Sequence, residues 1–254
     1  MSLNRIRIRI LLLAAVLASA ASCHSASADQ PTGQPAGQPE LASRPAPMPL
    51  SGDRLIALTF DDGPHGSRTA LILDELKRRG VRATFFVVGY RISRYPELLR
   101  RMAAEGHEIG NHTWNHPFLT RIPDAAIRHQ VERTQAAVAA VTGLRPAVMR
   151  PPFGAINTRV SRQLTLPAIL WSVESRDYLV RRPDEIYRLV TGRARPGGIV
   201  LCHDFWSAPA VGRIVDRLVA RGYRFVTVSE LLGFADGSVR PVPGRTYWRQ
   251  PVTR

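Results

Sequence analysis

The chain has 254 residues, enough to bury a large core in a single domain. Its formal net charge of +15 comes almost entirely from arginine, and such a charge suits nucleic acid, an anionic membrane or an acidic polymer equally well. With only Cys23 and Cys202 available, the composition excludes a framework of several disulfides.

The first residues predict export from the cell. Arginines at 5, 7 and 9 precede an apolar stretch over 10–20 and then small residues, which is the layout of a secretory signal peptide over residues 1–28. Cys23 lies in a sequence that resembles a degenerate bacterial lipobox, and lipidation there would be the chain's link to a membrane. Cleavage after Ala28 is the alternative. We therefore expect a secreted or cell-envelope protein.

Three further regions follow along the chain. Residues 29–50 are rich in Pro, Gly and Gln and are predicted to be a flexible linker. Residues 51–235 alternate between short apolar runs and amphipathic helical patterns, with helix ends marked by glycines such as Gly80 and Gly106. This alternation predicts repeated β/α units around a parallel sheet or barrel. Residues 236–254 show no periodicity and are predicted to be an irregular tail.

Acidic and histidine side chains gather where the predicted strands end. Asp61 and Asp62 follow the apolar run LIALTF, and His203 follows GIVLC. Because the carboxyl ends of parallel strands meet at one edge, we expect these groups to share one site. The alternative for the two aspartates is a turn and helix cap before a helix over 67–79.

The sequence HTWNH suggests a metal site. His112 and His116 are four residues apart, so on a helical turn both imidazoles would project from one face, close enough to share a cation. Two histidines and one carboxylate are a common catalytic zinc set. Taken alone, the pair does not establish a metal site, because histidines serve more often as helix caps or satisfied surface groups.

Five stretches together resemble the motifs of a known family. TFDDGP, HTWNH, RPPFG, WSVESRDY and LCH, in this order, resemble those of the polysaccharide deacetylase family, carbohydrate esterase family four, over roughly residues 54–232. The resemblance implies a distorted (β/α) barrel of the polysaccharide deacetylase type. It also implies metal-dependent removal of acetyl groups from amino sugars, as in peptidoglycan or chitin, with O-acetyl ester hydrolysis on xylan-like glycans as an alternative.

The resemblance also implies the metal ligands and the catalytic pair. Asp62, His112 and His116 would hold a divalent metal, zinc by first choice, with cobalt or another divalent cation as alternatives. Asp61 would be the general base and His203 the general acid. A catalytically impaired wall-binding module of the same fold is a third alternative, but a mere binder needs neither base nor acid.

Further residues would support the substrate and the catalytic pair. Arg150 would orient Asp61, and Asp177 would tune His203 or Arg150. The backbone N–H of Phe153 would stabilise the oxyanion. Around the substrate we expect three more residues of the family motifs, Pro152, Leu201 and Tyr178. Glu174 stands where the family usually has Asp, and Tyr178 where it usually has Trp, so we expect the substrate fit at this wall of the site to depart from the family pattern.

The remaining expectations concern partners. The arginines are scattered through predicted helices instead of forming one stripe, so we expect no nucleic-acid binding. We expect the protein to be a monomer and its partner to be an acetylated polysaccharide substrate. Trp114, Phe205 and Trp206 flank the histidine motifs and would either stack on sugar rings or belong to the core.

Overall fold

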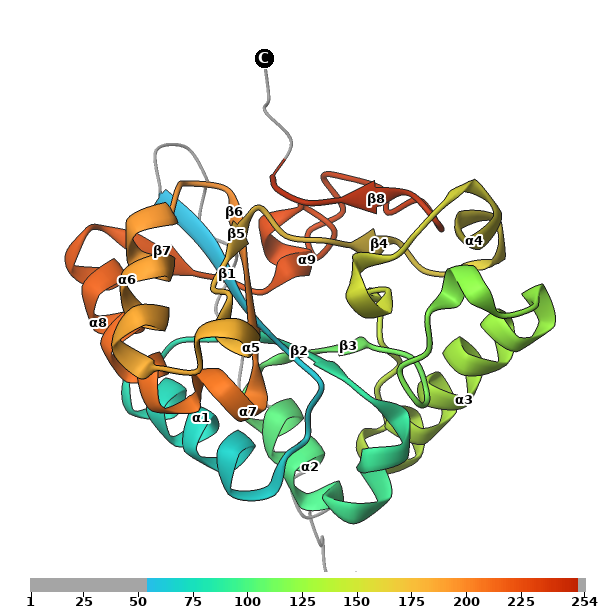
Figure 1. Ribbon diagram of the computed structural model, residues 1–254, viewed down its shortest axis with the longest axis horizontal. Helices are drawn as coiled ribbons and strands as arrows, with labels where there is room; N and C mark the ends of the chain where they lie inside the picture. The colour runs from blue at the N-terminus through green and yellow to red at the C-terminus, as the bar shows by residue number, and fades with distance from the viewer. Residues whose placement is uncertain (1–53, 251–254) are drawn as a thin grey trace, which may run out of the picture. The chain divides into compact units, whose positions relative to one another are not determined.

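The computed structural model describes residues 54–250, in which helices surround a set of parallel strands (Figure 1). The predicted signal peptide, the lipidation site at Cys23 and the linker over 29–50 lie outside the described residues. Within residues 54–250, no helix combines the length and the apolar character that crossing a membrane requires.

The central strand is β1 (Arg54–Asp61), which is buried from residue 55 onward. This burial explains its almost continuous apolar run, because strands of parallel sheets are covered on both faces. Its neighbours give the sheet order β3-β2-β1-β6-β5, and β7 also pairs with β1. These strands are β2 (Thr84–Val87), β3 (Glu108–Asn111), β5 (Val173–Glu174), β6 (Gly198–His203) and β7 (Tyr223–Phe225), and all of their pairings are parallel.

Isolated bridges connect a second, two-stranded pair to both sides of this sheet. That pair consists of β4 (Ala168–Ile169) and β8 (Thr246–Tyr247). Met149 bridges Asn111 to Ala168, and Arg249 bridges to Gly198 of β6. The pairing therefore follows a closed path, which is the distorted barrel that the family resemblance implies.

The prediction of an irregular tail over residues 236–254 is wrong at residues 246–247. They form β8, and Tyr247 is buried in an apolar cluster with Ile169 and Leu231. A two-residue strand has no measurable periodicity, so the sequence pattern could not reveal it.

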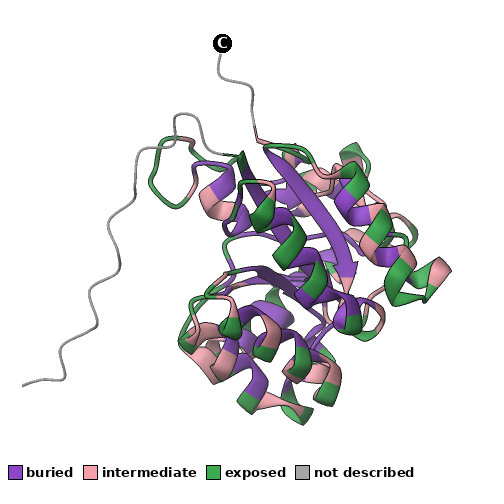
Figure 2. Cartoon of the chain, turned by 90° about the vertical axis from the view of Figure 1, so that its left-hand side faces the viewer, coloured by how far each residue is buried: buried purple, intermediate pink, exposed green. Residues whose placement is uncertain are grey.

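The longer helices form an outer layer in which neighbours touch in the order α6-α8-α1-α2-α3-α4 (Figure 1). The strands are buried, whereas the outward faces of the helices are exposed (Figure 2). Gly80, Gly106, Gly143 and Gly222 follow helices as predicted, each with positive φ. The helices are α1 (Gly66–Arg78), α2 (Pro96–Ala104), α3 (Asp124–Thr142), α4 (Thr158–Gln163), α5 (Asp177–Val180), α6 (Pro183–Arg193), α7 (Asp204–Ser207), α8 (Val211–Ala220) and α9 (Val228–Leu231). Between residues 54 and 250, the 3₁₀ turns are η1 (Gly89–Arg94), η2 (Leu119–Arg121), η3 (Pro152–Gly154) and η4 (Ala208–Ala210).

Strand register brings the predicted site residues to one end of the barrel. Asp61, the last residue of β1, pairs with His203, the last residue of β6, and with Phe86 of β2. Asn111, directly before His112, pairs with Val87 one residue further along β2. The polar residues that follow these strands therefore meet at a single rim.

Candidate metal and catalytic site

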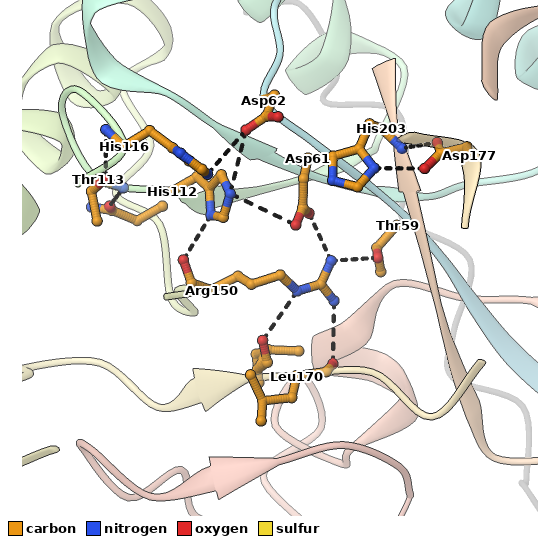
Figure 3. A network of polar contacts seen from close by, with 12 residues as sticks. Thr59, Asp61, Asp62, His112, Thr113, His116, Arg150, Leu170, Asp177 and His203 are labelled. Carbon is orange, nitrogen blue, oxygen red and sulfur yellow. Dashed lines mark hydrogen bonds and ion pairs between the residues drawn. The ribbon is translucent and has the colours of Figure 1, made fainter. Parts of the chain in front are cut away.

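A pocket of about 350 Å³ lies at this rim. It contains the predicted metal ligands and the predicted base and acid. Arg150 and Asp177 are not part of its lining, but they contact Asp61 and His203 (Figure 3). Its lining consists of Asp61, Asp62, His112, His116, Phe153, Gly154, Trp171, Glu174, Tyr178, Leu201, His203 and Trp206.

The two adjacent aspartates have different nearest partners, although Oδ2 of Asp61 also lies 3.7 Å from Nε2 of His112. Asp62 has a φ of 70°, a left-handed conformation that few residues other than glycine adopt. Asp61 is buried and its Oδ1 lies 2.7 Å from Nη1 of Arg150. Asp62 is about one third exposed, and its Oδ1 lies 3.5 Å from Nε2 of His112 and 3.3 Å from Nε2 of His116. The turn at Asp62 thus separates the two carboxylates.

Asp62, His112 and His116 can hold a metal ion. Their ligand atoms lie within 4.8 Å of one another, whereas Asp61 is outside the group. Nδ1 of His112 lies 2.7 Å from the backbone oxygen of Arg150, so Nδ1 donates its hydrogen there and Nε2 keeps a lone pair that can bind a cation. Burial lowers the pKa of His112 to about 3, although the negative charge of Asp62 acts to raise it. His112 is therefore neutral, which is the form of imidazole that binds metals. The residues fit a divalent cation with two nitrogen ligands and one oxygen ligand.

The helical geometry predicted for HTWNH is wrong. The segment after β3 is a loop in which Thr113 and His116 both have left-handed backbones, with φ of 66° and 60°. Side chains fix the loop, because the N–H of Thr113 donates to Oδ1 of Asn111 and the N–H of His116 donates to Oγ1 of Thr113. The two imidazoles still converge, with ring centroids 4.8 Å apart.

Arg150 is fully buried and anchors Asp61. Its Nη1 also donates to Oγ1 of Thr59, while Nε and Nη2 donate to the backbone oxygens of Ile169 and Leu170. Burial raises the pKa of Asp61, and the charges of Arg150 and His203 oppose this shift. Sequence reasoning missed Thr59, although a polar residue two positions before Asp61 faces the same side of the strand.

Asp177 contacts His203, which settles the choice between its two predicted partners. Its Oδ1 lies 2.7 Å from Nδ1 of His203, and its Oδ2 accepts from the backbone N–H of His203 and from Oγ of Ser207. Burial alone would lower the pKa of His203, but the hydrogen bond and charge of Asp177 outweigh it and raise the pKa to about 9. His203 is therefore protonated at neutral pH.

The residues expected around a substrate lie in or beside the pocket. Phe153 has a φ of 61° and occupies the second position of η3, where backbone N–H groups have no acceptor within the helix. Its ring stacks on Phe118 with centroids 3.8 Å apart. The hydroxyl of Tyr178 donates to Oε1 of Glu174 at 3.1 Å, so the two departures from the family pattern form one pair at the pocket wall. Pro152 is buried and precedes Phe153 outside the lining, while Leu201 is part of it.

The three aromatic candidates have different surroundings. Trp206 lines the pocket and Phe205 packs against it, with ring centroids 4.5 Å apart. Trp114 instead packs on Gly89 of η1, where a Cβ atom would lie 2.5 Å from its ring. Trp171 also lines the pocket, and sequence reasoning did not single it out.

Comparisons with known proteins agree with this architecture. A family model described as polysaccharide deacetylase matches residues 51–168. The peptidoglycan-N-acetylglucosamine deacetylase PgdA of Listeria monocytogenes is 43% identical over 183 residues, which cover 71% of this chain and 39% of that protein. The chain thus spans about two fifths of that relative's length.

Two further similarities cover most of the proteins concerned. The chitooligosaccharide deacetylase of Rhizobium leguminosarum bv. trifolii is 40% identical, over 72% of this chain and 84% of that protein. The structure of a family 4 acetyl xylan esterase from Clostridium thermocellum, in complex with a cobalt ion, superposes with a TM-score of 0.73. It is 33% identical and covers 78% of this chain and 100% of that one.

Proposed function

Since the chain belongs to the polysaccharide deacetylase family, we propose that it is an exported, metal-dependent N-deacetylase acting on amino sugars of peptidoglycan or chitin-like glycans. The observation that carries the proposal is one pocket containing a metal-ligand group, an arginine-bound carboxylate and a carboxylate-bound imidazole. The names of relatives that act on peptidoglycan and on chitooligosaccharides support the substrate class. Zinc suits a set of two imidazoles and one carboxylate, and the cobalt ion in the related esterase supports a divalent cation in general.

The residues divide the hydrolysis between them. When bound by Asp62, His112 and His116, a divalent cation supplies Lewis acidity, which acidifies water and polarises a carbonyl. Asp61, fixed by Arg150, takes a proton from the attacking water. The N–H of Phe153 donates to the carbonyl oxygen of the acetyl group, which becomes negatively charged when water attacks the carbonyl carbon.

His203 completes the reaction when the C–N bond breaks. An amine leaves poorly as an anion, so the imidazolium gives its Nε2 proton to the departing nitrogen, and acetate and the free amine result. Asp177 holds Nδ1 of His203 and favours the charged form. A wall-binding module without turnover would need neither this pair nor the buried Asp61.

Acetate release from a panel of acetylated glycans, with and without a chelator, tests the proposed function. We expect acetate from N-acetylated peptidoglycan fragments or chito-oligosaccharides, loss of activity with chelator, and recovery on adding a divalent cation. Release from O-acetylated xylan alone would favour the esterase alternative. No release from any glycan by metal-loaded protein would support the binding module.

The pKa of His203 gives a pH prediction. A general acid must be protonated, so activity is expected to fall as the pH rises through about 9. Asp177→Asn removes the charge that raises this pKa, and burial then lowers it, so the alkaline limb of kcat should move to lower pH by more than one unit. Ser207→Ala removes only one hydrogen bond to Asp177 and should move the limb far less. An unchanged alkaline limb in Asp177→Asn would contradict the role of His203 as acid.

A further inference from the structure

The pocket wall at Trp206 continues outward into a surface of rings and cations. The ring of Phe205 packs edge to face on Trp206, and the side chain of Phe205 is 41% exposed. On its other side, Phe205 meets the ring of His65 with centroids 5.5 Å apart. We call this surface the arginine rim; it consists of His65, Arg68, Arg91, Arg181, Phe205 and Trp206.

Two of the rim arginines lie over its rings. The guanidinium carbon of Arg181 is 4.4 Å from the centroid of Trp206, and that of Arg68 is 5.4 Å from the centroid of Phe205. Stacking on a ring orients a guanidinium group while N–H donors at its edge stay available to an anion. In Arg181, Nε donates to the backbone oxygen of Tyr178, so the donors available there are those of Nη1 and Nη2. Within residues 54–250, neither of these arginines forms an ion pair with a carboxylate. By contrast, Arg79 and Arg101 each pair with two acids.

The third arginine is paired with a histidine instead of an acid. Nη1 of Arg91 lies 3.2 Å from Nδ1 of His65. A guanidinium group only donates, so Nδ1 of His65 accepts and its Nε2 carries a hydrogen. Nε of Arg91 is buried and has no hydrogen-bond partner among the described residues. An unpaired charged donor is costly, and an anion bound nearby would reduce that cost.

The rim therefore offers cationic N–H donors and exposed aromatic rings next to the proposed reaction site. Neutral sugars need rings and mixed donors and acceptors, whereas a carboxylate needs donors alone. We propose that the arginine rim is a subsite for a carboxylate group of the glycan, so that the protein prefers acidic acetylated glycans to neutral ones. In a bacterial wall, such groups are the carboxylates of the peptide stem and, where no peptide is attached, the carboxylate of the lactyl group of muramic acid. This inference rests on the proposed deacetylase function and adds a substrate preference to it.

Selectivity between matched substrates tests the proposal. We compare kcat/KM for an N-acetylated muramic-acid tetrasaccharide with kcat/KM for neutral chitotetraose. In Arg68→Gln and in Arg91→Gln, the ratio of the two should fall roughly five- to tenfold, mainly through KM, and the fall should shrink as salt is added. Tetrasaccharides with and without peptide stems show which carboxylate is bound.

Arg217→Gln is the matched control. It removes the same charge from an exposed position in the last turn of α8, and the strand that follows, β7, pairs at Arg54 with the opposite end of β1. Its selectivity should equal that of the unaltered protein. An equal fall in Arg68→Gln and Arg217→Gln, or an unchanged ratio in both rim variants, would overturn the subsite.

A binding experiment separates this inference from the proposed function. Asp61→Asn protein is titrated calorimetrically with the muramic-acid tetrasaccharide and with the same glycan whose carboxylates have been converted to amides. The acidic form should bind roughly five- to tenfold more tightly, and Arg68→Gln should abolish the difference. This result would stand even if no acetate were released in the activity assay. Equal affinity for the two forms would refute the subsite while leaving the deacetylase function intact.

Discussion

Replacing Asp61 by Asn is expected to lower kcat by roughly 10²- to 10⁴-fold while the protein keeps about one equivalent of metal. The amide has the size of the carboxylate but cannot accept the proton of the attacking water. Asp61 lies outside the group of Asp62, His112 and His116, so all three metal ligands remain. Added metal should therefore not restore turnover.

The neighbouring Asp62 is the matched comparison, because it is the same residue type one position away. Asp62→Ala removes the charged member of the ligand group and leaves two imidazoles, so metal affinity should fall roughly 10- to 100-fold or more. Activity should fall with it and recover partly at high metal concentration. Metal content measured alongside acetate release separates the two variants.

Two outcomes would contradict this division of labour. Equal loss of metal from Asp61→Asn and Asp62→Ala would mean that both carboxylates are ligands. Full activity in Asp61→Asn would rule out Asp61 as the base.

His203→Ala should resemble Asp61→Asn in keeping metal, but it should impair amide substrates more than activated esters, whose leaving groups need no proton.

The grouping of acidic and histidine side chains at the strand ends was predictable from the sequence, because it depends on local apolar patterns. The apolar run before Asp61 and the run before His203 predict buried strands, and parallel strands bring their ends together. The geometry of HTWNH was not predictable, because it depends on left-handed backbones at Thr113 and His116 that only the surrounding hydrogen bonds determine.

Contacts over long sequence separations were the other limit. The partner of Asp177 could have been His203 or Arg150, and no spacing in the sequence distinguishes them. The position of Arg68 over Phe205 and of Arg181 over Trp206 also cannot be predicted from the sequence, where the arginines are scattered. Only tertiary packing brings these arginines together in the arginine rim beside the pocket.

Replacing Arg150 by Met is expected to destabilise the protein by about 3–5 kcal/mol at neutral pH, because it leaves the buried carboxylate of Asp61 without its cation. The backbone oxygens of Ile169 and Leu170 lose donors as well. In a domain of this size the melting temperature should fall by roughly 10 °C. Urea unfolding of the purified variants measures the free-energy change directly.

The pH dependence of this loss identifies its cause. Burial raises the pKa of Asp61 even when Arg150 is present, and removing Arg150 raises that pKa further. An acid whose pKa is raised in the folded state costs stability above that pKa, and the cost disappears as the pH falls and the group takes up a proton. The destabilisation by Arg150→Met should therefore be largest at neutral pH and shrink toward acidic pH. A loss that is constant with pH would mean that packing, not charge, is its origin.

A double-mutant cycle with Asp61→Asn separates the ion pair from the other contacts of Arg150. With the carboxylate already neutral, removal of the guanidinium group should cost much less than it does in the unaltered protein, and the remainder reports the bonds to Thr59, Ile169 and Leu170. Arg150→Lys keeps the charge but loses the fork that reaches several acceptors at once, so it should be intermediate. If the two single losses simply add in the double variant, the buried pair is not the feature that holds Asp61 in the orientation its proposed role requires.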